Sequence, residues 1–331
     1  MREVLILRLA SVHAHLLAEA ELFSQAICQS GVVHTVGPLK LRDPYTTERY
    51  NSLFSLLDTD TTKDLYALRS LPAESIVNLT SKQSGGALAA FFITDDTDCQ
   101  YGFFPPDTDW VTIRPFCKRF MIGDCATEAV VLAPLIAQMP LADIRKLLLG
   151  SSKLLSAYLA QFGLSKSQLA TFDHHTPAGM KALIDLMTDV GFHGPTQAVI
   201  AGSHPDSTFV YRFDRPNSWP ASPFAGTAHH TIELLYLASV PLTFPTSEAE
   251  IDRKLSKLLM KQWVDFAVGK QPWRPYGDEH WEMIYDVTGN AVSIRKEALQ
   301  SSGRRMVRGG FGEHTDEISR IKVAFSSGAV W

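Results

Sequence analysis

Short apolar strand patterns alternate with helical stretches along this chain of 331 residues, and this alternation constrains its fold most strongly. One pattern runs from Lys118 to Gly123, and a second, rich in aromatic and β-branched residues, runs from Ser207 to Asp214. Helices are predicted after Thr176, a residue typical of an N-cap, and after the capping-box pattern Ser247–Glu250. The run Ala10–Ala26, which contains no Gly or Pro, also predicts a helix, and the stretch Glu282–Lys296 predicts a hairpin with its turn at residues 288–290. Buried strands separated by helices are typical of a parallel sheet. We therefore expect an α/β fold.

The composition is that of a folded protein with a sizeable core. The chain is 45% hydrophobic and 20% charged, and it contains 18 Phe and 6 Trp. Its net charge of −4 does not favour a nucleic-acid partner, and no apolar run approaches the about 18 residues of a membrane helix. The stretch Met1–Leu9 is broken by Arg8 and does not have the pattern of a signal peptide.

Four cysteines, Cys28, Cys99, Cys117 and Cys125, are present without the paired spacing of a structural zinc site. Two disulfides or four buried thiols are both compatible with this number in a chain of this length. The sequence therefore predicts neither a metal site nor a cofactor.

Polar residues follow each of the two strand patterns. Glu128 comes just after the first strand pattern, and His230 lies in the loop that follows the second. Ligands and catalytic groups of open α/β sheets gather beyond the carboxyl ends of the strands. A carboxylate followed by a histidine matches the second half of a Ser…Glu…His triad, in which the carboxylate orients the imidazole and the imidazole takes a proton from serine. The alternative is a histidine that caps the start of a helix.

Four segments resemble, in the right order, segments of the type-B carboxylesterases, the family of cholinesterase-like esterases and lipases. They are Leu22–Gly31, Met121–Ala129, Gly226–Leu237 and the run from Gln262 to Trp273. The match is to the C-terminal portion of the family and is closest in character to its fungal members. The resemblance implies an α/β-hydrolase fold and a small-molecule ester as the substrate of the full-length family.

The same resemblance assigns roles to individual residues. It implies that Glu128 is the catalytic acid and that His230 is the catalytic histidine, because Glu233 stands three residues after His230 as the family pattern requires. His229 is then a neighbour. Ser30 is expected to support the site from behind through hydrogen bonds.

The nucleophile of such a site has no counterpart in these residues. No Gly-x-Ser-x-Gly motif occurs, and residues 4–9, Val-Leu-Ile-Leu-Arg-Leu, stand where the family pattern places it. The glycines of the oxyanion hole are also absent. Ser11 is the alternative nucleophile, but it is expected to lie in a helix, without the glycines that permit the strained turn.

From these absences we expect residues 1–331 to form a single truncated carboxylesterase-like domain that lacks the N-terminal strands of the sheet and is inactive alone. A non-catalytic cholinesterase-like binding module and a pseudoenzyme that regulates an intact relative are the alternatives. Phe103, Phe104, Trp110 and Trp219 are candidates for lining a substrate gorge, although core packing is the commoner fate of such aromatic residues.

Overall fold

The fold is seen in a computed structural model of the chain. The structure describes residues 4–8, 10–17, 21, 23–36, 39–40, 51, 69–75, 93–94, 111–150, 153–243, 247–295, 321–322 and 325.

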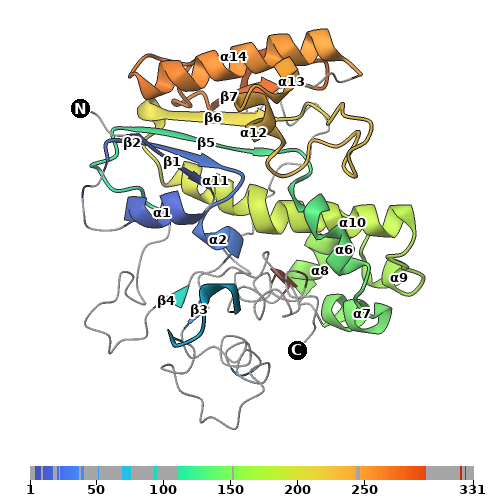
Figure 1. Ribbon diagram of the computed structural model, residues 1–331. Coiled ribbons are helices and arrows are strands. Elements are labelled where there is room, and N and C mark those ends of the chain that lie inside the picture. The colour runs from blue at the N-terminus through green and yellow to red at the C-terminus, as the bar shows by residue number, and fades with distance from the viewer. Residues whose placement is uncertain are drawn as a thin grey trace.

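A six-stranded sheet forms the centre of the molecule (Figure 1). Its strands, in spatial order, are β1 (Val4–Arg8), β2 (Gln25–Gln29), β5 (Arg119–Cys125), β6 (Thr208–Phe213), β7 (Trp281–Tyr285) and β8 (Ala291–Arg295). The first five run parallel, and β8 pairs with β7 in an antiparallel hairpin. A second sheet has two short parallel strands, β3 (Leu39–Lys40) and β4 (Ile93–Thr94). The α/β architecture expected from the alternation of strand and helix patterns is confirmed.

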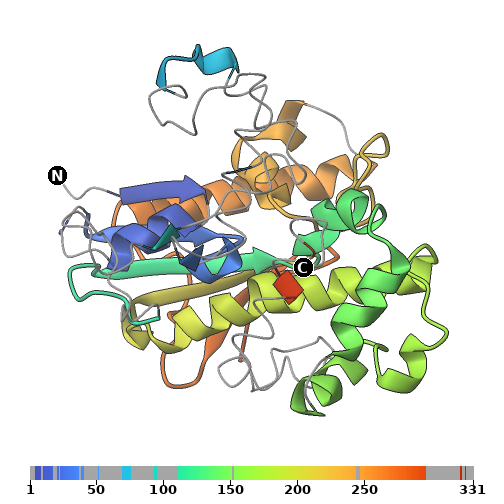
Figure 2. The same ribbon diagram turned by 90° about the horizontal axis from the view of Figure 1, so that it is seen from below.

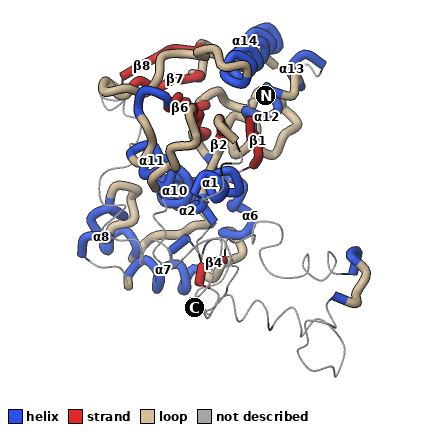
Figure 3. Tube along the Cα trace, turned by 90° about the vertical axis from the view of Figure 1, so that its left-hand side faces the viewer, coloured by secondary structure: helices blue, strands red, loops and turns tan. Residues whose placement is uncertain are grey.

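Helices cover both faces of the sheet, as Figure 3 shows in a view with α14 on one side and α1, α10 and α11 on the other. Successive strand residues point to opposite faces. Phe120 and Ile122 of β5 accordingly pack with Val12 of α1, while Met121 packs on the other face with Leu259 of α14.

The chain passes from β6 through a loop and α12 into α13 and α14. The helices have the following bounds: α1 Ala10–Leu17, α2 Val33–Val36, α6 Ala133–Ile136, α7 Leu141–Leu149, α8 Lys153–Ala160, α9 Lys166–Leu169, α10 Pro177–Thr188, α11 Gly194–Ala201, α12 Ile232–Leu237, α13 Val240–Thr243 and α14 Ala249–Ala267.

One helical run reaches the carboxyl ends of the strands. Helix α10 continues without interruption into a π-helical turn, η3 (Asp189–His193), and then into α11. Figure 2 shows this yellow-green run lying along the sheet. Single π-helical turns inside α-helices are frequent at functional sites. Two shorter 3-10 helices, η2 (Glu128–Leu132) and η4 (Pro205–Ser207), follow β5 and precede β6.

Two local predictions from the sequence are wrong. Residues 10–26 were expected to form one helix, but α1 ends at Leu17 and residues 25–29 form β2. Strand β2 is buried along its whole length between β1 and β5, and a fully buried strand lacks the alternation that distinguishes it from a buried helix. The expected capping box is also absent: Glu248 is the N-cap of α14 without a side-chain cap, and Ser247 Oγ instead donates to Ser218 O at 3.0 Å.

Within the described part of the chain, no helix combines the length and the apolar character required to cross a membrane.

Candidate active site

Glu128 lies directly beyond the carboxyl end of β5, as the first residue of η2. Its side chain has no exposed surface. Oε1 accepts a hydrogen bond from the backbone N–H of Cys125 at 2.6 Å, and Oε2 lies 2.6 Å from Nδ1 of His230. The following N–H, that of Ala129, donates to Thr188 Oγ1 at the end of α10 at 3.0 Å. These contacts hold the carboxylate in one orientation against the imidazole.

His230 comes from the loop that connects β6 to α12. The backbone of this loop is joined to the loop after β5 by a β-bridge between Thr127 and His229, and Thr127 N donates to Ala228 O at 2.9 Å. Because a carboxylate only accepts hydrogen bonds, Nδ1 of His230 carries the proton between them. A neutral His230 then has Nε2 as its proton-accepting atom, which is the tautomer that a general base requires. The side chain is 14% exposed and packs beside Phe192 of η3, with ring centroids 5.4 Å apart.

His229 is distinguished from His230 by its contacts. Its Nδ1 donates to the backbone oxygen of His230 at 2.8 Å, and its Nε2 accepts from the side-chain amide of Asn217 at 3.0 Å. Burial lowers the pKa of His229, so its ring stays neutral in this role. Both nitrogens are committed to holding the loop, which leaves His230 as the histidine that meets Glu128.

Glu233 lies in the first turn of α12, fully buried behind the pair. Ser30 Oγ donates to its Oε1 at 3.2 Å, and the Cys125 thiol donates to its Oε2 at 3.0 Å. Burial, and then the charge of Glu128, raises the pKa of Glu233 to about 7. Ser30 has a φ of 55° just beyond β2, and its N–H donates to Gly123 O at 2.8 Å. The structure therefore brings Ser30 and Glu233 together behind Glu128.

Cys125 is the member of this group that the sequence did not reveal. Its backbone holds Glu128 and its thiol holds Glu233, so one residue links the two carboxylates. Burial, followed by the charges of Glu233 and Glu128, raises the pKa of Cys125 well above its usual value, so the thiol keeps the proton that it donates. In the sequence, only its position three residues before Glu128 points to this role. A buried core cysteine without any role would look the same there.

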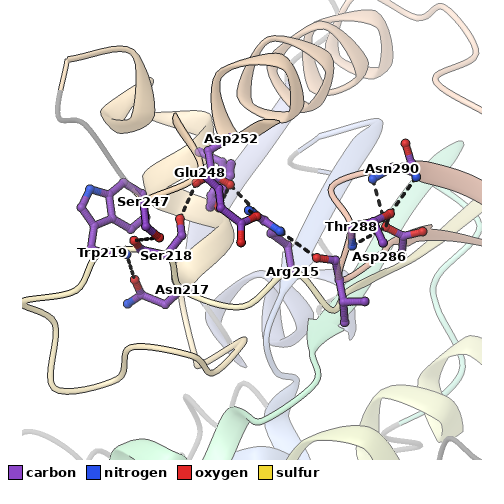
Figure 4. A network of polar contacts seen from close by, with 12 residues as sticks. Arg215, Asn217, Ser218, Trp219, Ser247, Glu248, Asp252, Asp286, Thr288 and Asn290 are labelled. Carbon is purple, nitrogen blue, oxygen red and sulfur yellow. Dashed lines mark hydrogen bonds and ion pairs between the residues drawn. The ribbon is translucent and has the colours of Figure 1, made fainter. Parts of the chain in front are cut away.

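The loop that carries His230 is fastened at its base by a polar network (Figure 4). Arg215 Nε donates to Asp252 Oδ1 of α14 at 3.0 Å, and Arg215 also pairs with Glu248 and donates to Val287 O at 2.7 Å. Ser218 donates to the second oxygen of Asp252. Asp252 has no exposed surface and the Arg215 side chain is 4% exposed. The network ties the loop to α14 and to the β7–β8 turn.

A cleft of about 330 Å³, lined by both polar and apolar groups, opens at the carboxyl ends of β5 and β6, beside the pair and not at it. Its lining includes Thr127, Thr188, His193 and Arg212, but neither Glu128 nor His230. His193 Nδ1 lies 2.7 Å from Asp124 Oδ2. Burial is the largest influence and opposes the charged imidazole, but the nearby carboxylates, Asp124 first and then Asp189, together raise the pKa of His193.

The structure describes only some of the other residues that the sequence singled out. Ser11 belongs to the backbone of α1, and its side chain lies outside the described residues, as do Phe103, Phe104 and Trp110. Trp219 is half-buried and packs against Tyr236, with ring centroids 6.0 Å apart. Residues 4–8, which stand where the family pattern places the nucleophile motif, form β1, and the strand is followed closely by α1.

Comparisons with known proteins agree with this fold and place the chain in a family. Human bile salt-activated lipase is 28% identical over 176 residues, covering 48% of this chain and 23% of the lipase. Mouse carboxylesterase 1E is 24% identical over 284 residues, covering 78% of this chain and 49% of the enzyme. A solved structure of PNB esterase superposes with a TM-score of 0.53 at 17% identity, covering 87% of this chain and 60% of that one.

The chain thus spans about half or less of the length of these curated relatives, and the likeness to PNB esterase concerns the fold alone. The model of the carboxylesterase family matches residues 9–308, which is most of the sequence. The chain therefore belongs to the carboxylesterase family.

Proposed function

We propose that this chain carries the acid–base half of a serine-esterase site, in which Glu128 orients His230 and His230 moves the proton. The observation that carries the proposal is the 2.6 Å hydrogen bond between His230 Nδ1 and a carboxylate without exposed surface, at the carboxyl end of a central strand. The reaction class is the hydrolysis of a carboxylic ester. Family membership supports this class, and Ser30 and Glu233 have supporting positions behind the pair.

The chemistry follows from the orientation of the imidazole. Nε2 of His230 takes the proton of an attacking hydroxyl, the new oxygen–carbon bond forms at the ester carbonyl, and the imidazolium is stabilised by the negative charge of Glu128. His230 then returns the proton to the leaving alcohol. Water repeats the sequence on the acyl-enzyme and releases the acid.

We also propose that these 331 residues do not complete this cycle on their own. The Gly-x-Ser-x-Gly motif is absent from the sequence, and both the acyl-enzyme and the stabilisation of the oxyanion depend on that elbow and the loops near it. Removing one member of a triad leaves only a slow background.

The test compares the purified chain with two variants, His230→Ala and Glu128→Gln, on short-chain activated esters. A parallel sample is treated with a phosphonate that labels activated serines, then digested and mapped by mass spectrometry. We expect no turnover that depends on His230 and no labelled serine. Turnover that falls at least tenfold in both variants, with a label on Ser11 or another serine, would overturn the proposed inactivity and support the roles of the pair. Turnover that falls in neither variant would indicate contamination or nonspecific surface chemistry, and not catalysis by this chain.

A further inference from the structure

A second group of donor side chains lies in the turn between α9 and α10 (Figure 1). Asp173, His174 and His175 each present one possible ligand atom, and these three atoms all lie within 4.8 Å of one another. The turn precedes α10, whereas Thr188 at the other end of this 12-residue helix contacts the Glu128 segment. The helix is about 18 Å long, so the two groups are separate sites.

The buried member, His174, indicates that the group has a ligand. Its side chain has no exposed surface; the backbone of Met139 lies near the ring, but no hydrogen bond of normal geometry reaches Nδ1 or Nε2 from the residues described. A buried polar atom without a partner destabilises the native state, so such atoms are rare in native proteins. His174 stacks on His175, with ring centroids 4.0 Å apart. The unpartnered nitrogens thus lie beside two further metal-ligating side chains.

The backbone that carries the three donors is held firmly. A Cβ on Gly179 would lie 2.0 Å from Asp173 O, so the first turn of α10 packs directly on this turn. Thr176 caps α10 by accepting from Gly179 N at 3.1 Å, and Arg145 Nη2 donates to Phe172 O at 2.6 Å. Asp173 Oδ1 accepts from His175 N–H at 2.9 Å, so the carboxylate keeps Oδ2 for a ligand. The backbone that carries the three donors is therefore preorganised by its surroundings.

We propose that Asp173, His174 and His175 bind one divalent transition-metal ion, of the zinc class. Two imidazoles and a carboxylate form a donor set that suits zinc, and three protein ligands leave a fourth position for water. With bonds of about 2.0–2.2 Å, ligand atoms on one tetrahedral ion lie about 3.3–3.5 Å apart. The ligand atoms, which lie within 4.8 Å of one another, must therefore move closer by up to about 1.5 Å, which requires rotation of the exposed His175 side chain and the half-buried Asp173 side chain. The sequence predicts no metal site from the spacing of its cysteines, and three consecutive donors such as these also lack the separated spacing of known zinc motifs.

Because the ion binds the folded turn, it stabilises the native state, and this stabilisation rises with the logarithm of the free-ion concentration once that exceeds the dissociation constant. The test uses the whole chain without an affinity tag. Equilibrium dialysis measures the binding of Zn²⁺, with Mg²⁺ as the control ion, and thermal unfolding is followed at increasing Zn²⁺. The variants are His175→Ala, whose side chain is exposed, and Asp173→Asn, which keeps the oxygen that accepts from His175 N–H. The matched control is His15→Ala, a change of an exposed histidine on α1.

We expect one Zn²⁺ per chain, an unfolding midpoint that rises with Zn²⁺ and not with Mg²⁺, and an affinity at least tenfold weaker in His175→Ala and in Asp173→Asn. His15→Ala should bind like the unchanged chain. Co²⁺ should give the visible absorption of a tetrahedral ion in the unchanged chain and lose it in both site variants. Absence of Zn²⁺ binding at tens of micromolar, or an equal loss in His15→Ala, would overturn the proposal.

Discussion

Nδ1 of His230 lies 2.6 Å from Oε2 of Glu128, although 102 residues separate the two in the chain. The carboxylate is fully buried and its other oxygen is engaged by the N–H of Cys125. Glu128 therefore cannot turn toward solvent without breaking two hydrogen bonds. A buried carboxylate fixed in this way determines which nitrogen of the imidazole carries a proton.

Replacing Glu128 by Gln tests this relationship directly. The amide keeps an oxygen for Cys125 N but places an NH2 group against His230, so the Nδ1 proton loses its acceptor. We expect the free energy of unfolding to fall by about 1–3 kcal/mol. Proton NMR of the unchanged chain should show a strongly deshielded Nδ1 proton, which disappears in Glu128→Gln and in His230→Ala and persists in His15→Ala. A resonance that persists in Glu128→Gln would contradict the geometry.

Glu233 should make the stability of the chain depend on pH in a direction opposite to that of most carboxylates. Its pKa is raised to about 7, by burial first and then by Glu128, from a usual value of about 4.3 in an unfolded chain. Between these two values the native state binds more protons than the unfolded state, so the stabilisation is fully present below about pH 4.3 and is lost as the pH rises through 7.

Glu233→Gln removes this titration and keeps an oxygen that accepts from Ser30 Oγ. We expect thermal unfolding to show a gain of about 1–3 kcal/mol for the variant over the unchanged chain at pH 8, with a much smaller difference at pH 5. Glu21→Gln, a change of an exposed carboxylate, serves as the control and should show no such contrast. The same difference at both pH values would show that Glu233 does not titrate in this range.

Much of the sheet was predictable because its pattern is local. The apolar runs of residues 118–123 and 207–214 became β5 and β6 within two residues, and the expected hairpin became β7 and β8. Thr176 caps α10 as its residue type predicts. Strand β2 was not predictable, because its identity comes from pairing with β1 and β5 on either side.

In the candidate site, too, local sequence patterns were predictable and contacts between distant segments were not. The resemblance of two local segments pointed to Glu128 and His230 without any knowledge of their distance. The role of Cys125 was not accessible, because its thiol acquires a partner only when Glu233, 108 residues later, folds against it. Ser247 likewise forms its bond to a loop 29 residues earlier and not to its own helix. Such contacts depend on tertiary structure and have no signature in a single sequence.

Arg215 should contribute far more to stability than an exposed cation of the same charge. Its side chain is 4% exposed and pairs with Asp252, a carboxylate without exposed surface. Removing one partner of a buried pair leaves the other charge uncompensated. We expect Arg215→Met to lower the free energy of unfolding, measured in urea, by about 3–5 kcal/mol.

Two further variants give this prediction its controls. Arg215→Lys should recover only part of the loss, because one ammonium group cannot reproduce the several directed bonds of the guanidinium. Lys254→Met breaks an exposed pair with Glu250 on α14, in which both side chains are 76% exposed, and should change stability by less than about 0.5 kcal/mol. Equal effects of Arg215→Met and Lys254→Met would show that the network in Figure 4 does not fasten the loop.

Gly123 and Gly191 should respond in opposite ways to the same substitution. A Cβ on Gly123 of β5 would lie 2.4 Å from the backbone oxygen of Tyr211 and equally close to its ring. The backbone of the neighbouring strand cannot yield without separating β5 from β6, so Gly123→Ala should cost about 3 kcal/mol or more. The site should change with it, since Gly123 O accepts from Ser30 N, and the deshielded proton of His230 should shift or vanish.

A Cβ on Gly191, within the π-helical turn, would meet no atom within 4 Å. Gly191→Ala should therefore stabilise the chain by about 0.4–1 kcal/mol, through the lower entropy of its unfolded state. Urea unfolding measures the free energy of unfolding of both variants. A Gly123→Ala chain as stable as the unchanged one would mean that β5 and β6 do not approach this closely beside the site.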